Sequence, residues 1–217
     1  MKKHLLALAL IAAAGAANAA VATYNFSNAE QTTEINQTGE LSLFDSSLGT
    51  LTSVSLKLFG SMTTTLTAFH TSSGPANGSI TGTVDLYFSS SLLDLTAVSP
   101  LSLSATTGLI RNLDPNTSLP VGPLTDNDFI ELSPATNLFS VAGGGKFGIA
   151  CESVSGIGAS GFNGNAKPGQ DTAAGCGAEI VYTYDAAPPP PAPVPEPTSM
   201  ALIGLGALGL AAIRRRK

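Results

Sequence analysis

Positively charged residues are scarce in this chain, and more than half of them lie at its two ends. Lysine and arginine total 10, against 15 aspartate and glutamate residues. Outside the terminal segments the only cations are Lys57, Arg111, Lys146 and Lys167. Because phosphate neutralisation needs clustered cations, this composition excludes nucleic-acid binding and argues against adhesion to anionic lipid headgroups. Divalent cations or cationic matrix components fit such an acidic body better.

Histidine is also rare in the chain, and tryptophan is absent. The two histidines are His4, near the start, and His70. A Ser-His-Asp triad would therefore rest on His70, but no GxSxG elbow is present and nucleophile activation needs converging partners. The simpler interpretation is a solvent-exposed histidine at the end of a strand. No catalytic residue, cofactor or metal ligand is assigned, and we do not expect an enzyme.

The N-terminus carries the features of a secretory signal. Lys2 and Lys3 precede an apolar run over residues 5–14, and Ala17 and Ala19 supply the small residues that signal peptidase requires. This pattern predicts a cleaved signal peptide over residues 1–19. A short membrane anchor is the alternative, but the apolar run is short and a cleavage site follows it.

The C-terminus carries a second hydrophobic segment. Residues 200–213 are apolar or small, and as a helix they would span roughly 21 Å, short of a ~30 Å hydrocarbon core. The positive-inside rule keeps the basic cluster that follows in the cytoplasm. The pattern therefore predicts a short stop-transfer transmembrane helix rather than a core helix. The basic cluster consists of Arg214, Arg215, Arg216 and Lys217.

A short motif precedes this segment. Pro195, Glu196 and Pro197, followed by an apolar helix and a terminal basic cluster, resemble the PEP-CTERM sorting signal of Gram-negative bacteria over residues 195–217. The resemblance implies cleavage near the motif by an exosortase. The helix would then insert only transiently in the inner membrane, and the body would be released to the cell surface or matrix. The proline-rich residues 186–194 form an extended spacer.

Between the signals, residues 20–185 are long enough for one domain. Val54, Leu56 and Leu58 alternate with polar residues, as do the apolar residues of 80–88 and 180–184. This period predicts half-buried strands and an all-β antiparallel sandwich or jelly roll. Further strands are expected at 22–26, 39–44, 63–70, 101–104, 129–132 and 146–151. Turns are expected at Gly74-Pro75, Asn77-Gly78 and Asp114-Pro115.

The two cysteines, Cys151 and Cys176, form an even pair in an exported chain, which predicts a disulfide. Closing the glycine-rich loop between them would stabilise the fold by about 3.5 kcal/mol in the chain-entropy model. Without the bond we expect that loop to be flexible. Two cysteines with no nearby histidine are too few ligands for a metal site.

The body also has a fainter resemblance. Residues 44–60, with Phe44, Leu48, Gly49 and Leu51, and the closing residues 180–185 resemble the choice-of-anchor E domain. The resemblance implies a β-rich surface module with no established activity. It supplies no catalytic residues.

One acidic cluster is a candidate for calcium. Asp126, Asp128 and Glu131 offer oxygen ligands, but the EF-hand glycine and terminal glutamate are absent. An acidic turn before a strand explains these residues equally well.

The sequence as a whole predicts an exported protein with a structural or adhesive role in an exopolysaccharide or biofilm layer. The alternative is a lectin-like module for exopolysaccharide, which requires aromatic side chains on an exposed face. The candidates for this role are Tyr87, Tyr182 and Tyr184, which lie in expected strands.

Overall fold

The computed structural model describes residues 19–188. Over this range the chain forms eleven strands and three short 3₁₀ helices, η1 (Ser46–Leu48), η2 (Thr136–Leu138) and η3 (Phe162–Gly164). In chain order the strands are β1 (Ala19–Ser27), β2 (Gln31–Thr32), β3 (Asn36–Asp45), β4 (Gly49–Phe69), β5 (Ala76–Ser90), β6 (Leu101–Thr106), β7 (Ile110–Leu113), β8 (Ser118–Leu132), β9 (Ser140–Val141), β10 (Gly145–Gly161) and β11 (Gly169–Ala186).

The expected signal peptide, apart from Ala19, the PEP motif and the helix at 200–213 lie outside the described residues. Within residues 19–188, no helix has the length and apolar character needed to cross a membrane.

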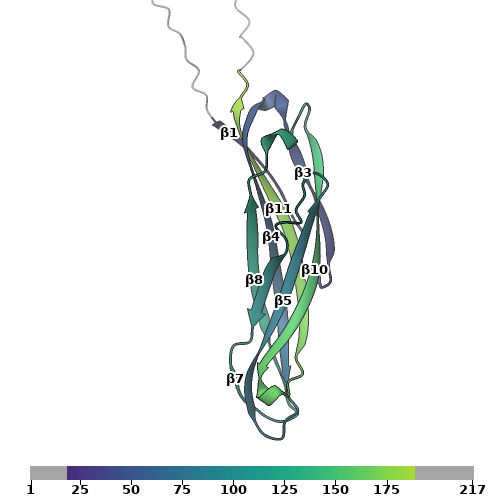
Figure 1. The fold of residues 1–217 in the computed structure, drawn as a ribbon, viewed down its shortest axis with the longest axis vertical. Coiled ribbons are helices and arrows are strands. Elements are labelled where there is room, and N and C mark those ends of the chain that lie inside the picture. The colour runs from purple at the N-terminus through teal and green to yellow at the C-terminus, as the bar shows by residue number, and fades with distance from the viewer. Residues whose placement is uncertain (1–18, 189–217) are drawn as a thin grey trace, which may run out of the picture. The chain divides into compact units, whose positions relative to one another are not determined.

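The strands form two sheets (Figure 1). The first, here called the β11 sheet, has the order β1-β11-β4-β8, with β2 also paired to β11. The second, the β10 sheet, has the order β6-β5-β10-β3-β9, with β7 paired to β5. The pairings are antiparallel apart from the short β3–β9 contact. The expected all-β sandwich is confirmed.

The two-residue period is what builds the sandwich. Leu56, Leu58, Gly60 and Met62 of β4 are buried, whereas the alternate residues between them face outward. The strand expected around residues 54–58 and the strand expected at 63–70 form one continuous strand. Threonines continue the same alternation through to Phe69. Gly60 allows this strand to pass close to the opposite sheet, since a Cβ there would lie 2.0 Å from Leu86.

The segment between the cysteines differs from its expectation. It is mostly strand: β10 continues to Gly161 and β11 begins at Gly169. Its residues from Glu152 through Gly161 pair with β5 and are ordered by that ladder.

A turn expected at Asn77-Gly78 is also wrong. Both residues belong to β5, at an irregularity in its pairing with β7. There the Asn77 Oδ1 accepts a hydrogen bond from the Asn112 backbone N–H at 2.7 Å. The polar residues therefore serve a bulge rather than a reversal.

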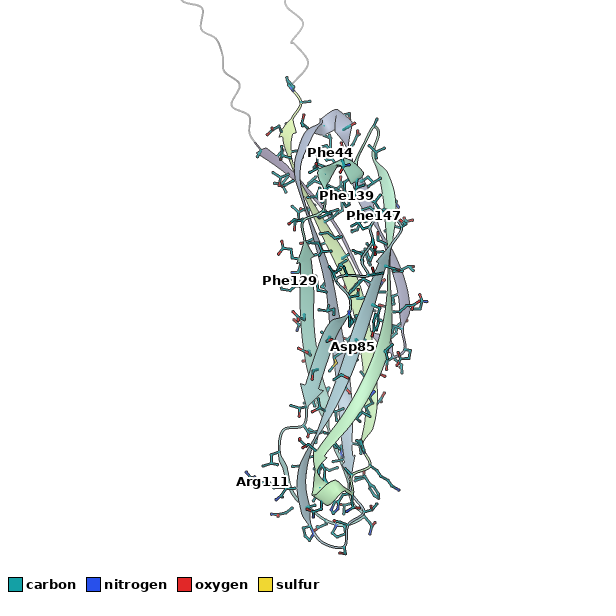
Figure 2. All side chains as sticks on the ribbon, in the orientation of Figure 1. Phe44, Asp85, Arg111, Phe129, Phe139 and Phe147 are labelled. Atoms are coloured by element: carbon teal, nitrogen blue, oxygen red, sulfur yellow. A yellow bond between two sulfur atoms is a disulfide. The ribbon has the colours of Figure 1, made fainter. Side chains whose placement is uncertain are left out.

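The interior contains two hydrophobic clusters. The larger includes Phe44, Phe139, Phe147 and Tyr182, and Figure 2 shows Phe44, Phe139 and Phe147 gathered towards one end. The smaller consists of Leu66, Ala68, Ala76, Ile80, Ile110, Leu113 and Phe162. Between them Thr64 and Thr172, both buried, hold their hydroxyls 2.6 Å apart.

A disulfide joins the two sheets through the larger cluster. Cys151 on β10 and Cys176 on β11 are bonded, with their Cα atoms 6.6 Å apart, as the sequence predicts. Beside it the Gln37 side chain accepts from the Cys176 backbone N–H at 3.1 Å and donates to the Ala29 carbonyl at 2.8 Å. The bond and this buried amide together connect β3, β10 and β11.

Candidate functional site

His70 is not the exposed histidine that the sequence led us to expect. Its side chain is fully buried and stacks on Phe162, with ring centroids 6.2 Å apart. The Nε2 contacts the Leu113 carbonyl, and the Nδ1 lies 2.9 Å from the Ser72 hydroxyl. The Ser72 hydroxyl also donates a hydrogen bond to the Gly74 carbonyl at 2.9 Å.

His70 is buried because it continues the two-residue alternation of β4. His70 follows Leu66 and Ala68 at steps of two, so it occupies an inward position. Both ring nitrogens have partners, Leu113 on β7 and Ser72 in the β4–β5 connection. The geometry fits a structural histidine at this end of the sandwich.

The three acidic residues considered for calcium lie within β8 rather than in a turn. Because five positions separate Asp126 from Glu131, their side chains point to opposite faces of the strand. Asp126 accepts a hydrogen bond from the Ser104 backbone N–H at 2.7 Å, and Glu131 accepts one from the Ser55 hydroxyl at 2.9 Å. Asp128 accepts from the Phe129 N–H at 2.8 Å.

These carboxylates therefore do not converge. Over residues 19–188 no group of three or more His, Cys, Asp or Glu side chains is placed to hold a metal ion. The interaction of Asp126 with Ser104 instead connects β8 to β6, which are edge strands of different sheets.

Two of the three candidate tyrosines face the interior. Tyr182 is fully buried and donates a hydrogen bond to the Ser42 carbonyl at 2.8 Å. Burial, and secondarily the nearby Tyr24, raises the pKa of Tyr182 above its usual value. Tyr184 packs against Phe44 with centroids 4.9 Å apart. Tyr87, by contrast, is 44% exposed.

The sequence reasoning missed the exposed aromatic side chain of Phe129. It is 50% exposed on β8, and Lys57 Nζ lies 4.2 Å from its ring centroid. Figure 2 shows it at the left-hand edge of the view, below Phe44, Phe139 and Phe147. The alternation along β8 could have identified it, because Ile130 and Leu132 face inward and the neighbouring Phe129 therefore faces outward.

Phe129 borders a surface hollow of about 340 Å³, here called the Phe129 groove. The hollow crosses the outer face of the β11 sheet. Its lining side chains include Ser27, Lys57, Phe59, Ser61, Asn127 and Phe129.

Phe59 belongs to the same groove and explains a glycine in β11. A Cβ at Gly177 would lie 2.5 Å from the Phe59 ring, so the ring packs directly on the bare backbone there. Phe59 and Phe129 are register partners on β4 and β8. The groove therefore draws two aromatic rings from neighbouring strands.

A second hollow, of about 540 Å³, lies on the β10 sheet. Its lining comes from Thr38 to Glu40, Ser89 to Ser91 and Gly148 to Ala150, with no aromatic side chain. At its rim Lys146 donates to Glu40 at 2.9 Å, and this hydrogen bond raises the pKa of the lysine. Both partners are well exposed, so the pair adds little stability.

The described part of the chain is thus an all-β sandwich pinned by one disulfide, with an aromatic groove on one outer face. Residues 193–217 match the PEP-CTERM protein-sorting motif. The match includes the expected motif at 195–197 and the basic cluster at 214–217. It indicates an exported protein that an exosortase processes and delivers to the cell surface.

No curated protein matches this chain. Among solved structures, a chain of Desmodium yellow mottle tymovirus is 11% identical, with a TM-score of 0.19, over 87% of this chain and 98% of its own. The infectious bursal disease virus VP2 subviral particle is 14% identical, with a TM-score of 0.18, over 98% of this chain and 54% of its own. Similarities at this level carry no argument about function.

Proposed function

We propose that the β-sandwich is a non-enzymatic surface module with a structural or adhesive role in the extracellular polymer layer of a Gram-negative bacterium. The observation that carries the proposal is the sorting motif at residues 193–217, a few residues after the last strand ends at Ala186. A module delivered by this route meets polysaccharide and other surface proteins before any soluble partner.

The resemblance of the body to the choice-of-anchor E domain is part of this proposal. Its two resembling stretches meet in the larger cluster, where Phe44 contacts Tyr182 and Tyr184 at centroid distances of 5.8 and 4.9 Å. The matching residues at this point are therefore packing residues, which supports a shared fold and suggests no shared chemistry.

The second candidate function is a lectin-like module. Its specific support is the half-exposed Phe129 beside a polar groove, which is the type of side chain that this alternative requires. Phe129 takes the role for which Tyr182 and Tyr184 were considered.

The delivery step is tested by intact mass spectrometry of the protein from cells and medium of an exosortase-containing host, beside Glu196→Ala. We expect a wild-type product that begins near Ala20 and ends near residues 195–197, and we expect it to co-fractionate with extracellular polymer. The Glu196→Ala variant should stay in the membrane fraction with Lys217 attached.

Two results would contradict the proposal. A wild-type product that retains Arg214 to Lys217 in the membrane fraction would make the helix a permanent anchor. A correctly trimmed product found free in the medium, with none in the washed polymer, would remove the structural or adhesive role.

A further inference from the structure

The Phe129 groove combines apolar surface with hydrogen-bonding groups. Phe59 lies on the backbone of β11, and half of Phe129 remains exposed although Lys57 Nζ is near its ring. Pyranose rings present C–H groups of partial positive charge on their flat faces, and an aromatic face, which is negative, attracts them. Two rings in one hollow therefore offer contacts for a sugar chain.

The polar side chains of the groove supply the second element of sugar recognition. Asn127 contributes an amide with donors and an acceptor, and Ser27 contributes a hydroxyl. Within residues 19–188 neither side chain makes a hydrogen bond to protein, and the Lys57 ammonium makes only its aromatic contact. The hydrogen-bonding groups of these three side chains are therefore available to the hydroxyl groups of a ligand.

The charges around the groove restrict the class of sugar. Lys57 pairs in register with Glu131 on β8 and Glu179 on β11. Asp128 lines the hollow, and Glu30 accepts a hydrogen bond from Ser61 at 2.7 Å. One cation among three carboxylates, with Asp128 beside them at the hollow, leaves the groove negative, so uronate or sulfated polymers are repelled.

We propose that the Phe129 groove is a binding site for a neutral polysaccharide, with Phe129 as the stacking residue and Asn127 and Lys57 as hydroxyl ligands. This inference rests on the proposed role in the polymer layer and assigns that role to one face. The groove is an open hollow on the sheet surface, which suits internal segments of a long chain as well as its ends.

The β10 sheet provides an internal comparison. Its hollow is larger, about 540 Å³, but no aromatic side chain lines it. Tyr87 is 44% exposed on the same sheet and lies outside that hollow. Substitution of Tyr87 therefore removes an exposed aromatic ring without touching the Phe129 groove, which makes it a matched control.

The test is affinity electrophoresis of the full-length chain in a polyoxyethylene detergent, which has no sugar headgroup. The gels contain hydroxyethyl-cellulose, dextran or galactomannan as neutral probes, and polygalacturonate as the acidic one. We expect at least one neutral polymer to retard the wild-type protein. Phe129→Ala should weaken that retardation about tenfold or more, the usual loss when a central aromatic contact is removed.

Asn127→Ala should weaken the same retardation less strongly, and Tyr87→Ala should leave it unchanged. Because all three positions are on the outer faces, circular dichroism and unfolding curves should show folded proteins. Retardation that survives Phe129→Ala overturns the assignment of the groove while leaving polymer adhesion intact. Retardation by polygalacturonate alone, or by no polymer, overturns the inference, whereas the proposed function stands or falls on the fractionation experiment.

Discussion

The two hydrophobic clusters of the sandwich differ in size and in how they are held together. The larger includes the disulfide and the aromatic group around Tyr182. The smaller has seven buried residues, and beside it the buried His70 binds Leu113 and Ser72. A covalent bond thus joins the sheets in one region, and hydrogen bonds and side-chain packing join them in the other.

The layer between the clusters is polar. Thr64 and Thr172 share a hydroxyl contact across β4 and β11, and the side-chain oxygen of Gln170 is buried without a partner among the described residues. Polar layers of this kind interrupt apolar packing, which lowers the energetic coupling between the regions on either side. We therefore expect the smaller cluster to open more readily than the larger one.

The strongest test of this difference uses two identical substitutions on one strand. Leu58 and Leu66 both lie on β4, face inward and are fully buried, one in each cluster. Each Leu→Ala change creates a cavity and should cost roughly 2–5 kcal/mol of unfolding free energy. Leu58→Ala should reduce the global value, measured by urea unfolding, by more than Leu66→Ala does.

Hydrogen exchange distinguishes the two variants further. In Leu66→Ala the amides of β7 and η3 should exchange faster than those of β11 near Cys176, because the smaller cluster opens locally. In Leu58→Ala protection should fall along both sheets. Uniform loss of protection in both variants would show that the clusters unfold as one unit.

The next largest loss of unfolding free energy is expected from removal of the disulfide. Replacing both cysteines by alanine, in Cys151→Ala/Cys176→Ala, releases a loop with a sequence separation of 25. The chain-entropy model gives a loss of about 3.5 kcal/mol, measured as the shift in the urea unfolding curve. Wild-type protein in reducing agent should show a similar shift. A loss below about 1 kcal/mol would mean that the unfolded chain is already compact in this region.

The sequence predicted the sandwich well because strand parity is a local property. The apolar faces that include Leu56, Leu58, Val84 and Leu86 were identified by alternation alone, and all four residues are buried. Strand lengths were predicted less well, since small residues such as those from Gly156 to Ser160 have weak preferences of their own. Their strand geometry comes from pairing with β5, which is a tertiary effect.

The candidate site was less predictable, for two reasons. His70 was expected at the surface because the type of residue was weighed above its parity with Leu66 and Ala68. Phe129 was placed in a strand, but the groove beside it needs three further strands that are distant in sequence. A sequence pattern can show which residue faces outward and cannot show which neighbours surround it.

The smallest effect separates hydrogen bonding from packing inside the larger cluster. Tyr182→Phe keeps the ring contacts with Phe44 and Phe139 and removes the hydrogen bond to the Ser42 carbonyl. At neutral pH we expect a loss of about 0.5–1.5 kcal/mol in unfolding free energy. Urea unfolding at pH 7 measures this value.

Alkaline pH should lower the unfolding free energy of the wild-type protein more than that of Tyr182→Phe. Burial raises the pKa of Tyr182 in the folded state, so above pH 10.0, its ordinary value, the unfolded chain loses this proton first. The unfolded state then binds fewer protons, and wild-type stability falls as pH rises from about 10. Tyr182→Phe should lose less stability than wild type between pH 9 and 11, whereas Tyr87→Phe should retain the wild-type decline. Parallel declines in all three proteins would place the alkaline sensitivity at groups other than Tyr182.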